Sequence, residues 1–402
     1  MAGLIALAFA YLFSQFYRSF LAVLTPELAT SIGATKTHLA DALGVWFVTF
    51  AAMQFFVGVS LDRYGPRRTV GWVFGICATA GVLLFAKAQA PWMITVAMGL
   101  IGMGCAPVLL GTLLIFARRF EARQFAIMTS WFVAVGNLGN VIGAAPMANA
   151  VEIFGWRTAM LALAVTTLAV AVAVLLLVKD PEHDQTTSDG MRGYITLLKM
   201  PVLWPILVMG LLCYAPVAGI RGLWTGPYLN DLHAADTLLI GKVTFWMAIA
   251  IIVGSFAYGP LDKIFNTRKR VVLIGNLCVL VLLLFFVFFP DMPLGLAAAL
   301  FIGFGLFGTS YAVVMAHCRA FLPPALVGRG VTLLNFCSIC GVGIMQFATG
   351  QVISSQSDQS SPQTYQLIFG TYAIVLAITI VVYLFSRDAP PEESSHADSS
   401  AP

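Results

Sequence analysis

Residues 45–63 read VWFVTFAAMQFFVGVSLDR, and residues 245–263 read FWMAIAIIVGSFAYGPLDK. Both stretches have tryptophan as the second residue and aspartate as the last but one. Trp46 and Asp62 therefore recur 200 residues later as Trp246 and Asp262. Self-similarity at a fixed spacing indicates that one structural unit is repeated along the chain. The repeat predicts two halves of similar architecture.

The composition is typical of a membrane protein. Of 402 residues, 59% are hydrophobic and only 10% are charged, too few to cover a water-soluble domain. Apolar runs of about 20 residues recur, each long enough to cross a bilayer as a helix. We expect an all-α membrane protein with twelve transmembrane helices. They are predicted at 3–26, 41–60, 69–88, 92–116, 125–149, 158–178, 202–229, 238–258, 271–289, 293–316, 331–352 and 363–385.

A polar interval at 179–201 divides these runs into six and six. The predicted organisation is therefore an N-terminal six-helix half (1–178), a cytoplasmic linker (179–201), a pseudo-symmetric C-terminal half (202–386) and a disordered cytoplasmic tail (387–402). Two repeats joined in this way are typical of secondary transporters, which bind their substrate between the repeats.

The positive charges lie mainly on one side of the predicted array. Sixteen of the 22 lysines and arginines follow even-numbered spans or lie in the tail. Because such residues mark the cytoplasmic side, we expect both termini in the cytoplasm. The clusters are short and separate, which excludes a nucleic acid partner. We expect a monomer in a plasma membrane, such as a bacterial inner membrane.

The stretch GVSLDRYGPRR, residues 58–68, follows the second predicted span. Gly58 allows close helix approach, Gly65 allows the positive φ of a tight turn, and Asp62 places a carboxylate beside cations. The stretch resembles the G-x-x-x-D-[RK]-x-G-[RK]-[RK] signature of the major facilitator superfamily, with Pro66 inserted. The resemblance implies a cytoplasmic latch between the halves in the outward-facing state, although the arginines could instead serve only to enforce topology. The gating motif comprises Gly58, Asp62, Arg63, Gly65, Arg67, Arg68 and, from the degraded second copy YGPLDKIFNTRKR, Asp262.

Two arginines lie inside predicted spans. Arg18 and Arg221 each belong to the first helix of a half and are 203 residues apart. An arginine at such a position costs roughly 2.5–3.5 kcal/mol even on a mild insertion scale, so it is expected to face an aqueous cavity. The central parts of the spans contain no aspartate or glutamate, so we expect an external anion to complete the site. Bracing by backbone carbonyls or aromatic faces is the alternative.

Arg18 precedes Pro26 by eight residues. This spacing resembles that of the organophosphate/phosphate antiporters and anion/cation symporters of the superfamily. In the former, a second arginine on the seventh helix completes the site, which implies this role for Arg221. The predicted substrate-binding residues are Arg18, Arg221, Tyr11, Gln15, Tyr214, Trp224, Asn137 and Tyr311.

These features favour a secondary active transporter that moves a small carboxylate or phosphorylated compound by alternating access. The lack of a midplane carboxylate or histidine predicts symport with a cation or proton, or exchange for a counter-anion. A drug or metabolite exporter of the same superfamily and a transporter-like receptor that does not transport are the alternatives. Histidines and cysteines lack metal-ligand spacing, so no enzymatic activity, metal or cofactor is expected.

Overall fold

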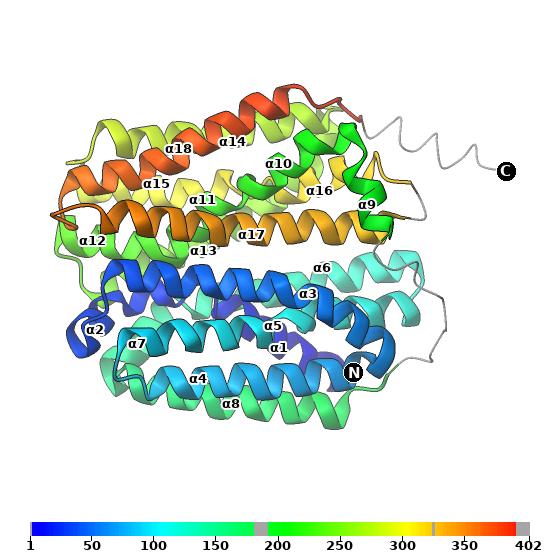
Figure 1. The fold of residues 1–402 in the computed structure, drawn as a ribbon, viewed down its shortest axis with the longest axis horizontal. Coiled ribbons are helices and arrows are strands. Elements are labelled where there is room, and N and C mark those ends of the chain that lie inside the picture. Colours follow the sequence, from blue (N-terminus) through cyan, green and yellow to red (C-terminus); the bar gives the residue numbers. More distant parts are fainter. Residues whose placement is uncertain (1, 181–191, 324–325, 391–402) are drawn as a thin grey trace. The chain divides into compact units, whose positions relative to one another are not determined.

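The computed structural model describes residues 2–180, 192–323 and 326–390, and the regular elements in these ranges are all helical (Figure 1). Residues 181–191 of the predicted linker and residues 391–402 of the predicted tail lie outside the described residues. In the described part, ten helices are long and apolar enough to cross a membrane, and two bent helix pairs bring the number to as many as twelve. The all-α membrane class is confirmed.

The first half of the chain contains nine helical elements, one of them a π-helical turn. They are α1 (Ala2–Phe16), α2 (Leu21–Ile32), α3 (Lys36–Val73), η1 (Phe74–Ala78), α4 (Thr79–Ala86), α5 (Pro91–Arg119), α6 (Ala122–Ile142), α7 (Ala145–Phe154) and α8 (Trp156–Leu177).

The second half begins with the short helix α9, and its seventh predicted span is divided into several pieces. The elements are α9 (Arg192–Leu198), η2 (Pro201–Leu203), α10 (Trp204–Cys213), α11 (Ala215–Gly219), η3 (Ile220–Trp224), α12 (Thr225–His233), α13 (Thr237–Ile264), α14 (Arg268–Phe288), α15 (Leu294–Phe307), α16 (Tyr311–Arg319), α17 (Val327–Ser354) and α18 (Pro362–Leu384).

Two spans of the first half that were expected to be continuous are bent at a break. The run predicted at 3–26 consists of α1 and α2, whose axes differ by 57°. The run predicted at 125–149 bends by 41° between α6 and α7. Interruptions within a membrane expose backbone groups that need new partners, and they are tolerated where the backbone is buried in protein or lines a cavity. Both breaks therefore mark positions where a polar site can form.

Local sequence explains several other helix boundaries. Gly33 ends α2 with φ 66° and ψ 29°, a left-handed conformation that glycine adopts without steric cost. Thr35 and His38 then form a capping box that starts α3. Gly65, with φ 77° and ψ 165°, interrupts the helical geometry of α3 at the predicted loop motif. The positive φ predicted for Gly65 is confirmed.

Residue contacts divide the chain into two compact units. The first unit contains Met1–Gln185, Ile220–Ala248 and Gln346–Ser355. The second unit contains Thr186–Gly219, Ile249–Met345 and Gln356–Pro402. Two segments of the C-terminal half thus pack with the N-terminal half, and one of them carries Arg221.

The core of the second unit is rich in aromatic residues. The ring of Phe286 lies 4.4 Å from that of Phe369 and 4.7 Å from that of Phe301, which joins α14, α15 and α18.

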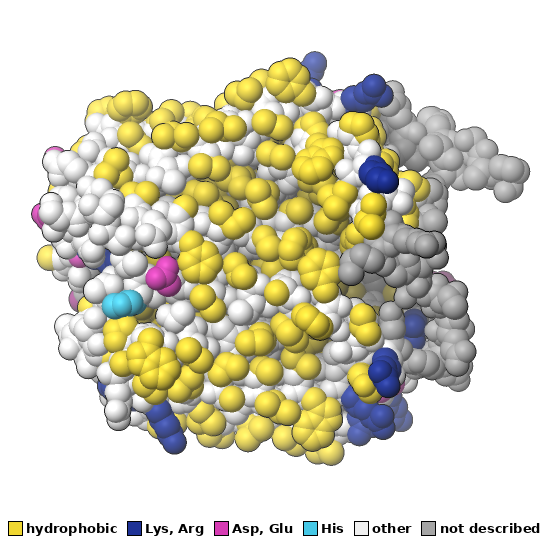
Figure 2. Space-filling model, in the orientation of Figure 1, with side chains coloured by type: hydrophobic (Ala, Val, Ile, Leu, Met, Phe, Trp, Pro, Cys, Tyr) yellow, Lys and Arg dark blue, Asp and Glu magenta, His cyan; other side chains and the backbone are white. Residues whose placement is uncertain are grey.

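The surface of the protein is also apolar. For example, the side chains of Phe256 and Phe385 are 73% and 80% exposed. Figure 2 shows hydrophobic side chains over much of the visible face, with Lys and Arg gathered towards its right-hand end. Such a surface suits a lipid environment.

Candidate functional site

Arg18 lies where the first span breaks. α1 ends at Phe16 and α2 begins at Leu21, so Arg18 belongs to the short segment between them. The Ser19 hydroxyl donates to the carbonyl oxygen of Phe16 at 3.2 Å and supplies a partner at the open end of α1. The arginine therefore projects from an irregular segment and not from the side of a continuous helix.

The guanidinium of Arg18 lies over two aromatic rings of α3. Its Cζ atom is 5.1 Å from the ring centroid of Trp46 and 4.8 Å from that of Phe50. Arg18 is half-buried, and a cation–π contact of this kind is worth about 0.5–2 kcal/mol. The Nε atom is buried and has no hydrogen-bond partner among the described residues. The rings stabilise the charge without providing the carboxylate or carbonyl oxygens that a guanidinium fork binds best.

Tyr11 and Gln15 precede Arg18 on α1 and interact with each other. The Gln15 Nε2 atom donates to the Tyr11 hydroxyl at 2.9 Å. The Tyr11 ring stacks on Phe132 of α6 with centroids 5.0 Å apart. Both predicted ligands are buried and contribute to the packing of α1, and their contact with a substrate stays a prediction.

Arg221 has a different environment from Arg18. It lies in the π-helical turn η3, is 5% exposed, and donates twice to Asn140: to Oδ1 at 3.1 Å and to the backbone oxygen at 2.9 Å. Asn140 lies in the last turn of α6, where carbonyl groups lack partners in a following turn. A cation is also favoured there by the helix dipole. Arg221 thus stabilises the break between α6 and α7. Asn140 also donates to the predicted ligand Asn137 at 3.4 Å.

Replacing Asn140 by alanine should destabilise the substrate-free protein, because it removes one of the two acceptors of Arg221. A hydrogen bond to a charged group contributes about 1.5–3 kcal/mol, so the free energy of unfolding should fall by about that amount. Chemical denaturation in detergent would measure it. Asn149→Ala is the matched control, since its side chain is exposed and donates to the Ala145 carbonyl oxygen of its own helix. Equal effects of the two substitutions would contradict the bracing role.

The remaining predicted ligands are divided between the units. The indole N–H of Trp224 donates to the Thr349 hydroxyl at 3.1 Å within the first unit. Tyr214 and Tyr311 lie in the second unit with ring centroids 6.4 Å apart, and the Tyr311 hydroxyl donates to Asn335 Oδ1 at 3.1 Å. The first unit brings together Tyr11, Gln15, Arg18, Asn137, Arg221 and Trp224.

The gating motif is attached to the end of α8. The main-chain N–H of Arg67 donates to Asp180 Oδ1 at 2.7 Å, and its Nε atom donates to the Leu175 carbonyl oxygen. A Cβ atom at Gly58 would meet no atom within 4 Å, so the predicted close helix approach at Gly58 is wrong for this structure. The side chain of Asp62 lies outside the described part, and its latch role stays a prediction.

The second copy of the motif has an equivalent attachment. Asp262 pairs with Arg268 at 3.4 Å, and the main-chain N–H of Lys269 donates to Asp388 Oδ1 at 3.0 Å. Partial burial raises the pKa of Asp388, but hydrogen bonds from Thr267 and main-chain N–H groups outweigh burial and hold this pKa below its usual value. In each half, an aspartate that follows the last span thus accepts a hydrogen bond from a main-chain N–H near the start of the third span. The pairs are Asp180 with Arg67 and Asp388 with Lys269.

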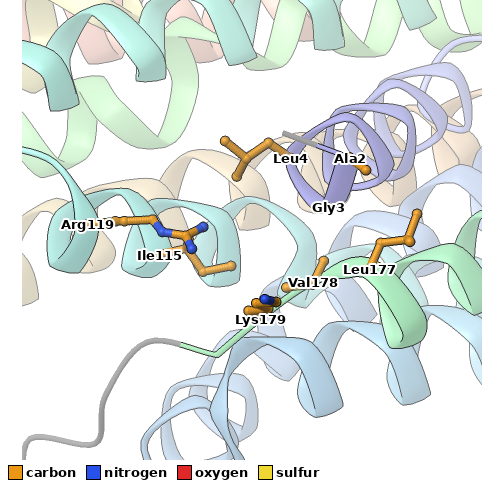
Figure 3. A pocket seen from close by; sticks show the side chains of 8 residues that line it. All are labelled: Ala2, Gly3, Leu4, Ile115, Arg119, Leu177, Val178 and Lys179. Atoms are coloured by element: carbon orange, nitrogen blue, oxygen red, sulfur yellow. The ribbon is translucent and has the colours of Figure 1, made fainter.

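A separate pocket of about 240 Å³ lies at the far end of α1 (Figure 3). Arg119 and Lys179 line it together with residues 2–4, 115, 177 and 178. Along α1, Arg18 is about 21 Å away from this end at 1.5 Å per residue. The pocket is therefore distinct from the Arg18 site.

Sequence reasoning missed the aromatic partners of Arg18. Trp46 and Phe50 are four residues apart and share one face of α3, a spacing that was available from the sequence. In the sequence, Trp46 is marked only by its recurrence as Trp246 in the 200-residue repeat. The segments around Arg18 and Arg221 meet, since a Cβ atom at Gly222 would lie 2.9 Å from the Arg18 carbonyl oxygen. The site is thus built on the contact of two chain segments that the sequence placed 203 residues apart.

Comparison with known proteins agrees with this architecture. The Major Facilitator Superfamily pattern matches residues 7–241 and 217–401. A probable L-galactonate transporter of Escherichia coli (strain K12) is 21% identical over 95% of this chain and 88% of its own. The sialic acid transporter NanX of the same organism is 22% identical, covering 94% and 89%. The membrane sensor protein UhpC of Salmonella typhimurium is 22% identical, covering 74% and 77%. A crystallised variant of the nucleoside transporter NupG shares the fold with a TM-score of 0.76, 13% identity, and coverage of 96% and 99%.

Proposed function

Because the chain belongs to the Major Facilitator Superfamily, we propose that it is a secondary active transporter that moves a small organic anion by alternating access. It is a multi-pass membrane protein and not an enzyme, as its family and the solved transporters similar to it indicate. The observation that carries the proposal is Arg18. Its charge is held in the span by Trp46 and Phe50, and its buried Nε atom has no partner among the described residues.

The electrostatics of the site favour a carboxylate with a single negative charge. Arg221 already donates to both oxygens of Asn140, so Arg18 is the cation more readily available to a ligand. One guanidinium balances one charge and can bind a carboxylate through two parallel hydrogen bonds. The relatives named for L-galactonate and sialic acid support the same class. In this proposal Arg221 is the second anion ligand once it releases Asn140.

Contacts within the first unit are suited to cover one side of the Arg18 site. Lys36, which begins α3 directly after α2, forms an ion pair with Asp231 of α12. Gly222 and Gly226 bring η3 and α12 against the backbone of Arg18 and Ala22. We propose that these contacts separate to expose Arg18 on the side opposite to the chain termini. That side is the exterior if the termini are cytoplasmic, as the charge distribution predicts.

Coupling is proposed to involve a counter-anion or a co-transported cation, in a monomer of the bacterial inner membrane. Counterflow in proteoliposomes tests the function. Vesicles preloaded with unlabelled L-galactonate should transiently accumulate labelled L-galactonate above equilibrium, because alternating access exchanges the two pools. The similarity to a sensor protein makes binding without counterflow the informative contrary result. Binding of an anion without its counterflow would favour a receptor.

The latch predicts a kinetic defect in Asp62→Asn. If this carboxylate stabilises the outward-facing state, its loss should slow turnover several-fold while expression stays near wild type. Initial rates of uptake, normalised to protein in the membrane, would measure the effect. Asp291→Asn is the control, because Asp291 is an exposed residue far from the motif in sequence. Wild-type turnover in Asp62→Asn would leave the motif as a topology signal.

A further inference from the structure

Gln346 is a buried polar residue that the described structure leaves unsatisfied. It lies on α17, its side chain is 0% exposed, and neither Nε2 nor Oε1 has a hydrogen-bond partner among the described residues. Buried amides in folded proteins nearly always have partners, so an exception requires an explanation. A ligand that forms hydrogen bonds with the amide is one such explanation.

The contacts of α17 place the residue after Gln346 against α3, the helix whose aromatic rings contact Arg18. The next residue, Phe347, has its ring 3.0 Å from the Cβ position of Gly44 on α3. The adjacent residue on α3, Leu43, lies 3.0 Å from the Cβ position of Gly222, which also contacts the Arg18 carbonyl oxygen. Thus α17 and η3 meet α3 at neighbouring residues, all within the first unit.

A second contact joins α17 to the seventh span. Trp224 donates to Thr349, and the seventh and eleventh predicted spans run in the same direction because four crossings separate them. Three residues before Trp224 is Arg221, and three residues before Thr349 is Gln346. Arg221 and Gln346 therefore each lie three residues before one partner of this hydrogen bond, on two segments that contact each other within the first unit.

Trp46 adds a second unsatisfied donor near Arg18. Its indole Nε1 atom is buried and has no acceptor among the described residues, while its ring lies under the Arg18 guanidinium. An amide offers both donors and an acceptor, and an indole offers one donor. A carboxylate can satisfy Arg18 and an indole, but only a group that both donates and accepts satisfies both ends of an amide. A hydroxyl is such a group.

We infer that Gln346 binds a hydroxyl group of the transported anion, so the substrate class is a hydroxylated carboxylate. This inference rests on the proposed function, in which Arg18 binds the carboxylate. Gln346 would then determine specificity, because a site with a buried hydrogen-bonding group rejects analogues that leave it unpaired. An aliphatic acid of equal length would leave the amide unsatisfied.

The test compares D-gluconate with hexanoate, two six-carbon monocarboxylates of which only the first has hydroxyl groups. Binding to purified full-length protein in detergent would be measured by calorimetry. Wild type should bind D-gluconate at least 10-fold more tightly than hexanoate. Gln346→Leu keeps the side chain's approximate size and should lose at least 10-fold for D-gluconate while hexanoate binding is unchanged or improved.

Thermal unfolding provides a second measurement that does not depend on the chosen acid. Gln346→Leu removes unsatisfied buried groups and should melt at or above the wild-type temperature without ligand. Gln54→Leu is the matched control, since Gln54 is also buried in the first unit but has an interaction partner. Gln54→Leu should melt lower. A lower melting temperature for Gln346→Leu would overturn the inference, because it would indicate a structural bond.

The outcomes separate this inference from the proposed function. If Arg18→Gln abolishes binding of both acids while Gln346→Leu preserves the preference for D-gluconate, the hydroxyl role fails and the anion site stands. Equal affinity of wild type for the two acids would also overturn the hydroxylated class. Binding of neither acid to wild type would count against the inference as well, and the counterflow experiment would then decide the transport function independently.

Discussion

Arg18→Gln is expected to abolish anion binding and transport. Glutamine cannot supply the positive charge or the two parallel donors that a carboxylate requires. Arg18→Lys keeps the charge but loses the fork, so its binding should fall by about 10-fold or more. Titration of purified variants with D-gluconate, or with the best anion from a screen, would measure both effects.

Folding of the Arg18 variants can be checked independently of binding. An arginine within a span costs free energy, so Arg18→Gln should express normally and unfold no more easily than wild type. A substitution in one of the aromatic rings that contact Arg18 should have a smaller effect on anion binding than a substitution of Arg18 itself. Phe50→Leu removes one ring from beneath the guanidinium, a contact with centroid distance 4.8 Å. It should weaken binding less than Arg18→Lys does. Wild-type affinity in Arg18→Lys would mean that Arg18 only braces the bundle.

Gly226→Leu is expected to stop transport while leaving a competent binding site. A Cβ atom at Gly226 would lie only 2.1 Å from the Ala22 carbonyl oxygen, so any side chain forces α12 away from α2. Overpacking costs about 1–3 kcal/mol, which shifts a two-state equilibrium by about 5- to 150-fold. The carrier should therefore accumulate with this contact open and fail to alternate.

Counterflow and equilibrium binding should diverge in this variant. We expect counterflow to fall to roughly 20% of wild type or less, in line with the shift in population, with anion affinity changed by less than about threefold. Gly295→Leu is the control, because a Cβ atom there would meet no atom within 4 Å. Normal counterflow in Gly226→Leu would mean that α2 and α12 need not pack closely during transport. Loss of binding together with counterflow would indicate misfolding.

Much of the fold could be predicted from the sequence, because the patterns that indicate membrane-spanning helices extend over about 20 residues each. Apolar runs and the 200-residue repeat predicted spans that correspond to the helices found. The breaks between α1 and α2 and between α6 and α7 could not be predicted in this way. The run around Arg18 contains neither glycine nor proline at 17–20, so nothing local marked the end of α1 at Phe16. That end depends on tertiary packing, which periodicity does not encode.

The sequence predicted the charged residues of the candidate site, but it did not predict which groups these residues contact. Arg18 and Arg221 were identified because charge is unusual within a span. Which groups each contacts depends on the meeting of distant helices. The pairing of Arg221 with Asn140 arises from the broken end of α6, a feature absent from the expected continuous span. Gln346 resembled other amides within spans until its burial and lack of described partners distinguished it.

The charge of the site also has an electrical consequence in the proposed mechanism. Arg18 and Arg221 are both permanent cations, so release of a bound monoanion raises the net charge of the site from one to two positive charges. Moving one charge across the full field changes its energy by about 2.3 kcal/mol per 100 mV. In this mechanism, reorientation of the empty carrier is therefore more sensitive to membrane potential than reorientation of the loaded carrier. A one-for-one exchange of monoanions moves the same charge in both directions, so we expect exchange to be electrically silent and net flux to depend on voltage.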